Sequence, residues 1–220
     1  QLSDGELRQR PIPEFDLPVF PPRTRSDEAS AHASVDDVAA QRLALSARNV
    51  QVRGLGPFTV DAPAGQVTHI AGPNGCGKTS LMLAALGLVD YEGTIMVGRC
   101  GWAPTALDQS FLYRRVIDEV AGDRKVLEIF GLEKWAEEHP LDVPTSDRRL
   151  VLVAATMAGQ PDVLLLDEPT VGLDVDGHRK LLEGIDAFVR QDRKPAVLWT
   201  CHDQRVADAV SDRSIVIAQD

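Results

Sequence analysis

The chain carries, at positions 72–79, the run Gly72-Pro73-Asn74-Gly75-Cys76-Gly77-Lys78-Thr79. This run matches the phosphate-binding pattern G-x-x-x-x-G-K-[ST] at each fixed position. A strand-like apolar run, residues 67–71, precedes it, and a helix-forming run, residues 80–86, follows it, which is the context that the pattern requires. The glycines permit backbone angles that turn successive N–H groups inward around a polyphosphate. The sequence therefore predicts a site for a nucleoside triphosphate.

Each part of this loop has an expected contact with the nucleotide. Lys78 is expected to reach the β- and γ-phosphates, and the hydroxyl of Thr79 is expected to hold Mg²⁺. Cys76 is interpreted as a small filler of the loop, in preference to a redox-sensitive thiol. The residues predicted to bind the nucleotide are Gly72, Pro73, Asn74, Gly75, Cys76, Gly77, Lys78, Thr79, Ser80 and Asp167.

A glycine-rich turn could produce the first pattern alone, but a second element argues against that interpretation. The apolar run 163–166 ends in Asp167 and Glu168. Such a run is typical of a strand buried on both faces of a parallel sheet, whose carboxyl end carries the chemistry. Asp167 fits the role of magnesium partner, usually through water, and Glu168 fits the role of general base for the attacking water. Thr79 and Asp167 are thus the predicted metal-binding residues.

The residues around two of the predicted strands carry a family resemblance. The run Asp167-Glu168-Pro169-Thr170-Val171-Gly172-Leu173-Asp174 resembles the D-E-P-T-x-x-L-D run of ABC-type ATPases. The run Ala196-Val197-Leu198-Trp199-Thr200-Cys201-His202-Asp203 resembles the strand of that family that ends in its switch histidine. The resemblance covers residues 43–218, and the motifs together are highly specific.

The resemblance implies a fold, cofactors and further roles. The implied fold is an α/β P-loop NTPase with a mainly parallel sheet, helices on both of its faces, a small antiparallel β subdomain and an inserted helical subdomain. The implied cofactors are ATP and Mg²⁺. Asp174 would belong to the loop that touches the opposite nucleotide-binding domain. His202 would contact the γ-phosphate and position Glu168 and the water, whereas a lone histidine after a strand would by itself be interpreted as structural.

Composition limits the partners. The 220-residue chain has a formal net charge of −10, which argues against a nucleic-acid groove, because phosphate contacts need clustered Lys and Arg. The short basic pairs are interpreted as solvated surface: Arg23 and Arg25, Arg114 and Arg115, Arg148 and Arg149. No apolar run approaches the roughly 20 residues that cross a bilayer, so membrane contact is expected only through a partner. Three cysteines without metal-ligand spacing fit a reducing cytosol, at the inner face of the cell membrane.

The chain divides into a tail and a domain. Residues 1–40 contain several helix-breaking prolines and are predicted to be a linker or tail. The run Leu2–Glu6 is either a hairpin near the end of a preceding ATPase domain or a stray match to the family signature. The prolines that follow favour the hairpin, and hence a preceding tandem domain. Residues 41–220 form the predicted ATP-binding domain, with the helical subdomain at about 105–158. Helices are expected at Lys78–Leu86, Arg148–Ala158 and Gly177–Arg190.

Two departures from the family pattern concern the base and the metal. Family members carry an aromatic residue that stacks on adenine before the phosphate strand, but the run Asn49–Gly54 contains none. Adenine should therefore be held weakly unless Arg53 stacks on it instead. Thr105 stands where the family has a glutamine, and its shorter side chain could reach magnesium only through an added water. The separation of Lys78 and Thr105, 105 − 78 = 27 positions, also suggests a shortened antiparallel subdomain.

A third departure lies at the family's L-S-G-G-Q signature, which falls on Val143-Pro144-Thr145-Ser146-Asp147. In this family the signature faces the γ-phosphate bound by the other domain of a head-to-tail dimer. Pro144 and the missing glycines remove the backbone N–H approach that this contact uses. The chain is therefore expected to present a good phosphate loop and a poor signature.

These patterns together predict an ATP-binding and ATP-hydrolysing subunit that energises a membrane transporter, most like an importer of the energy-coupling-factor class. The expected partners are a second ABC ATPase domain, which forms an asymmetric pair with this one, and a transmembrane coupling subunit docked near Gln109–Val120. Two alternatives stay open. One is a regulatory half that binds nucleotide with little turnover, and the other is a soluble ABC ATPase acting in translation or DNA repair.

Overall fold

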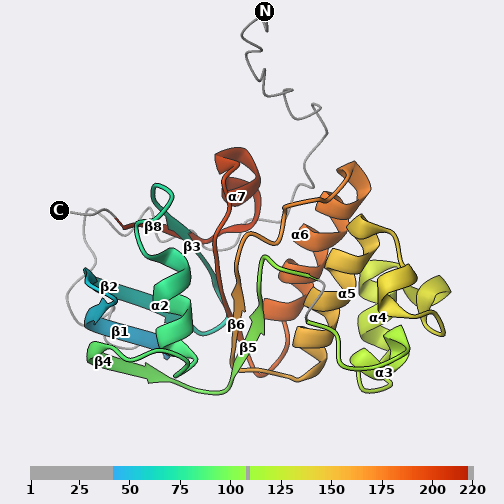
Figure 1. The fold of residues 1–220 in the computed structure, drawn as a ribbon, viewed down its shortest axis with the longest axis horizontal. Helices are drawn as coiled ribbons and strands as arrows, with labels where there is room; N and C mark the ends of the chain where they lie inside the picture. The colour runs from blue at the N-terminus through green and yellow to red at the C-terminus, as the bar shows by residue number, and fades with distance from the viewer. Residues whose placement is uncertain (1–41, 108–109, 218–220) are drawn as a thin grey trace, which may run out of the picture.

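The computed structural model describes residues 42–107 and 110–217. The expected tail at 1–40 and the hairpin at Leu2–Glu6 lie outside the described residues, as do Asp108 and Gln109. The described chain forms a central parallel sheet, a smaller antiparallel sheet on one side of it and a group of helices on the other (Figure 1).

The central sheet has the strand order β5-β6-β7-β3-β8, and all of its neighbouring strands are parallel. Every residue of β6 and β7 is buried, because the sheet is covered on both faces. The apolar runs that predicted these strands therefore reflect two-sided burial. The strands are β3 (Val67–Ala71), β5 (Cys100–Ala103), β6 (Val163–Leu166), β7 (Ala196–Trp199) and β8 (Arg213–Val216).

The antiparallel sheet has the order β2-β1-β4 and consists of β1 (Leu43–Val52), β2 (Leu55–Pro63) and β4 (Glu92–Val97). Between Lys78 and Thr105 the described chain forms a helix, β4 and β5. That helix, α2 (Lys78–Ala85), lies beside this sheet in Figure 1. Together they form one hydrophobic cluster against one face of the central strands.

The longer helices begin slightly before their predicted starts. The helix α5 spans Thr145–Ala158, and α6 spans Val175–Val189. Asp174 caps α6 by accepting a hydrogen bond from the backbone N–H of Gly177 at 2.7 Å, so the helix starts at the next residue after the cap. Both helices pack into a second hydrophobic cluster, on the other face of the sheet. The last helix, α7 (Gln204–Val210), follows β7.

Short helical elements fill the region between β5 and α5. They are α3 (Val116–Glu119), α4 (Arg124–Phe130), and the 3₁₀ turns η2 (Glu133–Trp135) and η3 (Pro140–Asp142). In Figure 1 they lie beyond α5 and α6, away from the antiparallel sheet. Within the described ranges, none of the helices is long and apolar enough to cross a membrane.

Candidate nucleotide site

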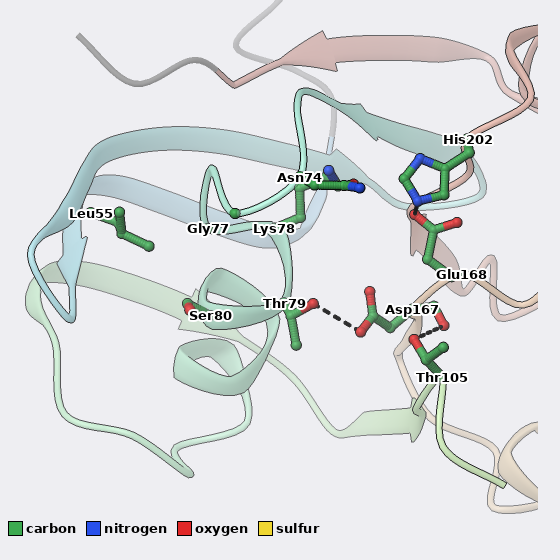
Figure 2. Close-up of a pocket in the computed structure, with 11 residues that line it drawn as sticks. Leu55, Asn74, Gly77, Lys78, Thr79, Ser80, Thr105, Asp167, Glu168 and His202 are labelled. Atoms are coloured by element: carbon green, nitrogen blue, oxygen red, sulfur yellow. Dashed lines mark hydrogen bonds and ion pairs between the residues drawn. The ribbon is translucent and has the colours of Figure 1, made fainter. Parts of the chain in front are cut away.

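A cavity of about 290 Å³ opens where the carboxyl ends of β3, β6 and β7 meet the start of α2 (Figure 2). It brings together residues that are far apart in the sequence. The lining residues are Leu55, Asn74, Gly75, Gly77, Lys78, Thr79, Ser80, Thr105, Asp167, Glu168 and His202. Most of the residues predicted to bind nucleotide therefore line one cavity, together with both predicted catalytic residues.

The other three residues predicted to bind nucleotide do not line the cavity but contribute to the structure of the loop; they are Gly72, Pro73 and Cys76. Lys78 Nζ donates hydrogen bonds to the carbonyl oxygens of Gly72 at 2.7 Å and Pro73 at 2.9 Å. These bonds hold the ammonium group across the loop and place its charge at the cavity. Cys76 is buried in the cluster on the side of the antiparallel sheet, which agrees with its interpretation as a filler.

Two glycines of the loop are required by close packing. Gly77 has a φ of 105°, and a Cβ there would approach the ring of Phe58 to 2.6 Å. Gly72 has a φ of 152°, and a Cβ there would collide with the carbonyl oxygen of Ile217. A larger residue at either position would displace the loop from the strands beneath it. The pattern of fixed glycines thus follows from the packing of this chain.

Asp167 is held by hydrogen bonds on both carboxylate oxygens. Its Oδ2 accepts from the hydroxyl of Thr79 at 2.9 Å, and its Oδ1 accepts from the hydroxyl of Thr200 at 3.1 Å. A carboxylate beside a hydroxyl at the edge of a phosphate loop is an oxygen donor set that fits Mg²⁺, which takes one or two carboxylates and completes its shell with phosphate oxygens and water. The two predicted metal-binding residues therefore lie in contact.

Glu168 lies beside Asp167 in an unusual backbone conformation, with φ at 51°. Its side chain is buried, and Oε1 lies 3.4 Å from Nε2 of His202, while Oε2 has no hydrogen-bond partner among the described residues. Burial raises the pKa of the Glu168 carboxyl, and the charge of Asp167 adds to the rise, although His202 and Lys78 oppose it. The carboxylate is therefore more basic than an exposed one, as a proton acceptor requires.

His202 belongs to the turn between β7 and α7, and its side chain is 58% exposed. Figure 2 shows its ring next to the carboxylate of Glu168 and directed at it. The turn is fixed by Asp203, whose side chain caps α7 by accepting from the backbone N–H of Arg205 at 2.9 Å. The base of the side chain is thus anchored, and its ring has room to contact a bound molecule.

Thr105 lines the cavity, but its hydroxyl is already engaged. It donates to the backbone carbonyl of Asp167 at 3.0 Å. The segment around it is held from below by Arg149, which donates to the carbonyls of Pro104 at 2.9 Å and Thr105 at 2.6 Å. Arg149 is only 4% exposed, so its interpretation as solvated surface was wrong. The carbonyls of Pro104 and Thr105 accept hydrogen bonds that the guanidinium would otherwise donate to water.

At the signature position, the side chains are bonded within the chain itself. Ser146 exchanges hydrogen bonds with Asp174, donating to Oδ1 at 3.0 Å and accepting from the backbone N–H at 3.2 Å. Asp147 accepts from the indole N–H of Trp135 at 2.7 Å and pairs with Lys134 at 3.6 Å. Pro144 precedes the first residue of α5. These polar groups support α5 and α6.

Two residues of the site were missed by sequence reasoning. Leu55, the first residue of β2, lines the cavity, whereas Arg53, the one residue considered as an alternative to the aromatic residue, does not. Thr200 is hydrogen-bonded to Asp167 and Glu168 but does not itself line the cavity. The one available signal for Thr200 was its position, a polar residue at the end of the apolar run 196–199.

Comparison with known proteins agrees with this arrangement. A family model described as ABC transporter matches residues 55–171. The zinc import ATP-binding protein ZnuC of Ruegeria pomeroyi is 33% identical over 189 residues, which cover 78% of this chain and 73% of that protein. A putative ABC transporter ATP-binding protein of Saccharolobus solfataricus, SSO2030, is 30% identical over 70% of this chain. The chain spans about a third of the length of that relative, 34%.

Solved structures confirm the predicted fold class. The structure of cbiO1 from Clostridium perfringens, described as part of the ABC transporter complex cbiONQ, superposes with a TM-score of 0.71. The match covers 80% of this chain and 85% of that one, at 19% sequence identity. A putative metal-chelate type ABC transporter in an inward-facing conformation superposes with a TM-score of 0.70, at 23% identity and 81% coverage of both chains.

Proposed function

The chain belongs to the family of ABC transporter ATP-binding proteins, and from this premise we propose that it binds Mg-ATP in the cavity and hydrolyses it to drive a membrane transporter. The observation that carries the proposal is the convergence of a cation, a hydroxyl-carboxylate pair and a basic carboxylate on one cavity. The residues in question are Lys78, Thr79, Asp167, Glu168 and His202.

The binding step depends on the loop and on Lys78. The loop N–H groups and the Lys78 ammonium surround the phosphates, so that bound nucleotide replaces the contacts of Nζ with the loop carbonyls. Thr79 and Asp167 would hold the Mg²⁺ ion, which would neutralise charge on the phosphates. Leu55 provides an apolar contact at the far end of the cavity from His202, where the base would lie (Figure 2).

The hydrolytic step depends on Glu168 and His202. Glu168 accepts a proton from a water molecule, whose oxygen attacks the γ-phosphorus. The bond from that phosphorus to the bridging oxygen of ADP breaks, and ADP and phosphate are the products. His202 lies 3.4 Å from the Glu168 carboxylate, close enough to orient it and the water. The raised pKa of Glu168 favours acceptance of the proton.

A transmembrane coupling subunit is the partner that the surface favours. Leu112 and Tyr113 are 84% and 54% exposed, and their backbone N–H groups both donate to Oε1 of Glu119 at 2.7 Å. One carboxylate thus holds a turn that presents two large apolar side chains to solvent. Large apolar side chains presented together are typical of a contact surface. The proposed docking region includes this turn and α3, and it would hold the chain at the inner face of the membrane through its partner.

The proposal includes importer activity and a second ATPase domain. The relatives named as import proteins, including the ZnuC proteins, support import, and the energy-coupling-factor class is the specific assignment proposed. We propose that the second domain supplies an intact signature to the nucleotide bound here. In return this chain would offer Ser146 and Asp147, whose side chains are occupied by Asp174 and Trp135. Such a pair would hydrolyse ATP at one site and be slow at the other.

One observation favours a second candidate, a regulatory half with little turnover. The hydroxyl of Thr105 is committed to the backbone of Asp167, so this side chain does not take the place of the glutamine near the metal. Under this alternative the chain binds Mg-ATP without contributing to hydrolysis, and its role is to hold the dimer closed.

The test uses the full chain assembled with its partner subunits. Glu168→Gln should leave Mg-ATP binding within about twofold and lower turnover by about 10²–10⁴, the usual contribution of a general base. The exposed Glu92→Gln serves as the matched control and should leave both unchanged. Unchanged turnover with Glu168→Gln would contradict hydrolysis at this site and favour the regulatory half. If the wild-type chain does not bind Mg-ATP, both the hydrolytic function and the regulatory function are contradicted.

A further inference from the structure

Thr200 is a fully buried polar residue directly after the four apolar residues of β7. Its hydroxyl makes two hydrogen bonds with neighbouring residues of the site. It donates to Oδ1 of Asp167 at 3.1 Å and accepts from the backbone N–H of Glu168 at 2.9 Å. Both its donor and an acceptor lone pair are therefore used. One hydroxyl connects the proposed metal partner to the proposed general base.

The first bond fixes the Asp167 carboxylate. With Thr79 on Oδ2 and Thr200 on Oδ1, rotation of the carboxylate would break one bond or the other. Asp167 and Thr200 directly follow β6 and β7, which pair in the parallel sheet, and Thr79 lies in the first turn of α2. The bond from Thr200 to Oδ1 therefore keeps the other oxygen of Asp167, Oδ2, facing Thr79 in the phosphate loop.

The second bond acts on the backbone of Glu168. A φ of 51° is unfavourable for a residue with a side chain, and it persists only where the surroundings hold it. The hydroxyl of Thr200 accepts the N–H of this residue and so supports that conformation. The carboxylate itself is lightly restrained, because Oε2 has no hydrogen-bond partner among the described residues and Oε1 lies 3.4 Å from Nε2 of the exposed His202.

We propose that Thr200 is a positioning residue that orients Asp167 and Glu168 together, an inference that rests on the proposed function of that pair. Thr200 does not line the cavity, so it acts on bound nucleotide only through its two neighbours. Loss of its hydroxyl leaves the buried N–H of Glu168 and one oxygen of Asp167 without a partner. The backbone of Glu168 and the Asp167 carboxylate then lose their common restraint.

The same sheet supplies a matched control. Thr68, on β3, is equally buried, and its hydroxyl has no hydrogen-bond partner within the described part of the chain. Thr68→Val and Thr200→Val make the same isosteric change, in strands that are neighbours in the sheet. The two variants differ in whether a bonded hydroxyl is lost.

The experiment measures kcat and KM for ATP in the assembled transporter. Thr200→Val should lower kcat by at least about tenfold with KM within about twofold, because the loss falls on alignment of the base rather than on phosphate binding. Thr200→Ser keeps the hydroxyl and should stay within about threefold of wild type. Thr68→Val should stay within about twofold, since no hydrogen bond is lost. If Thr200→Val does not fold, Thr200→Cys, a weak donor of similar size, should lower kcat at least about threefold.

Two results would overturn the inference: wild-type kcat in the hydroxyl-free variant, or an equal fall of kcat in Thr200→Ser and Thr200→Val. Glu168→Gln in the same assay separates this inference from the proposed function. If kcat falls in Glu168→Gln but not in Thr200→Val, only the role of Thr200 is rejected, and the proposed function stands. No fall with Glu168→Gln rejects hydrolysis at this site.

Discussion

The side chain of Ser146 and the backbone and side chain of Asp174 exchange two hydrogen bonds, at 3.0 Å and 3.2 Å. Ser146 belongs to the first turn of α5, and Asp174 is the N-cap of α6, so the pair joins the starts of two helices. The carboxylate of Asp174 also accepts a hydrogen bond from the backbone N–H of Gly177, so it is directed at the first turn of α6. A side chain bonded in this way is a support for the helix start.

Ser146→Ala should therefore reduce stability more than activity. The lost bonds should lower the free energy of unfolding by about 1 kcal/mol, the typical cost of a lost cap or hydrogen bond. ATP turnover of the assembled pair should change by less than about twofold, or 0.4 kcal/mol. Denaturant unfolding and ATPase assays measure the two effects, with the exposed Thr145→Ala as control. A collapse of turnover would show that this serine works on the partner's nucleotide.

Lys78→Ala should weaken Mg-ATP binding by at least about tenfold, because a hydrogen bond to a charged group contributes about 1.5–3 kcal/mol. The charge lost is the one that the carbonyls of Gly72 and Pro73 hold at the cavity. Titration of the chain with a fluorescent ATP analogue measures the change. The exposed Lys125→Ala is a control outside the cavity. Equal affinities for wild type and Lys78→Ala would mean that nucleotide binds elsewhere.

Selectivity between ATP and GTP should be smaller than about tenfold, or 1.4 kcal/mol. Leu55 gives the base an apolar contact, but it offers neither an aromatic face nor a hydrogen bond that reads the purine edge. Leu55→Tyr should tighten binding of both nucleotides, by about 1–3 kcal/mol if the ring stacks on the base. Competition titrations with the two nucleotides measure both effects. A strong adenine preference in the wild-type chain would require a base contact from another residue.

Glu168→Gln should stabilise the folded chain at neutral pH. Burial raises the pKa of Glu168, so the folded chain binds this proton more tightly than the unfolded chain does. The folded state consequently loses stability as the pH rises from the ordinary carboxyl range through the raised pKa. The amide removes that loss, so the gain in Tm should shrink as the pH falls from above the raised pKa into the ordinary carboxyl range. Thermal unfolding over a series of pH values checks this, and a gain independent of pH would contradict it.

Arg149→Lys should destabilise the chain by roughly 1–3 kcal/mol, because a lysine cannot serve both carbonyls with the planar fork of a guanidinium. The carbonyls of Pro104 and Thr105 would compete for one ammonium group in a site that excludes water. Arg205→Lys, at an exposed position, is the control. Chemical denaturation measures the difference between the two variants, which should vanish if Arg149 contributes only its charge.

Local sequence patterns predicted the central fold because its strands are short apolar runs and the loop is a fixed pattern. Residues 163–166 and 196–199 are buried throughout, and the two acids that follow the first run lie at the cavity. The helices α5 and α6 were predicted to within a few residues; α6 starts early because Asp174 caps it, and α5 starts directly after Pro144.

The residues that escaped prediction are those whose partners are distant in sequence. Arg149 bonds to carbonyls 45 and 44 positions away, so adjacent charged residues gave no sign of its burial. Thr200 bonds to residues 32 and 33 positions away. Leu55 reaches the cavity because the antiparallel sheet folds back against the phosphate loop, a contact that its neighbours in the sequence do not indicate.

The Arg149 bonds also couple α5 mechanically to the segment that lines the cavity. Arg149 belongs to α5, and the carbonyls that it holds follow directly after β5, beside the cavity. A shift of α5 along its axis would either move Thr105 as well or break the two buried hydrogen bonds of Arg149. Thr105 is bonded in turn to the backbone of Asp167. A displacement of α5 would therefore be transmitted through Arg149 and Thr105 to Asp167, the proposed metal partner.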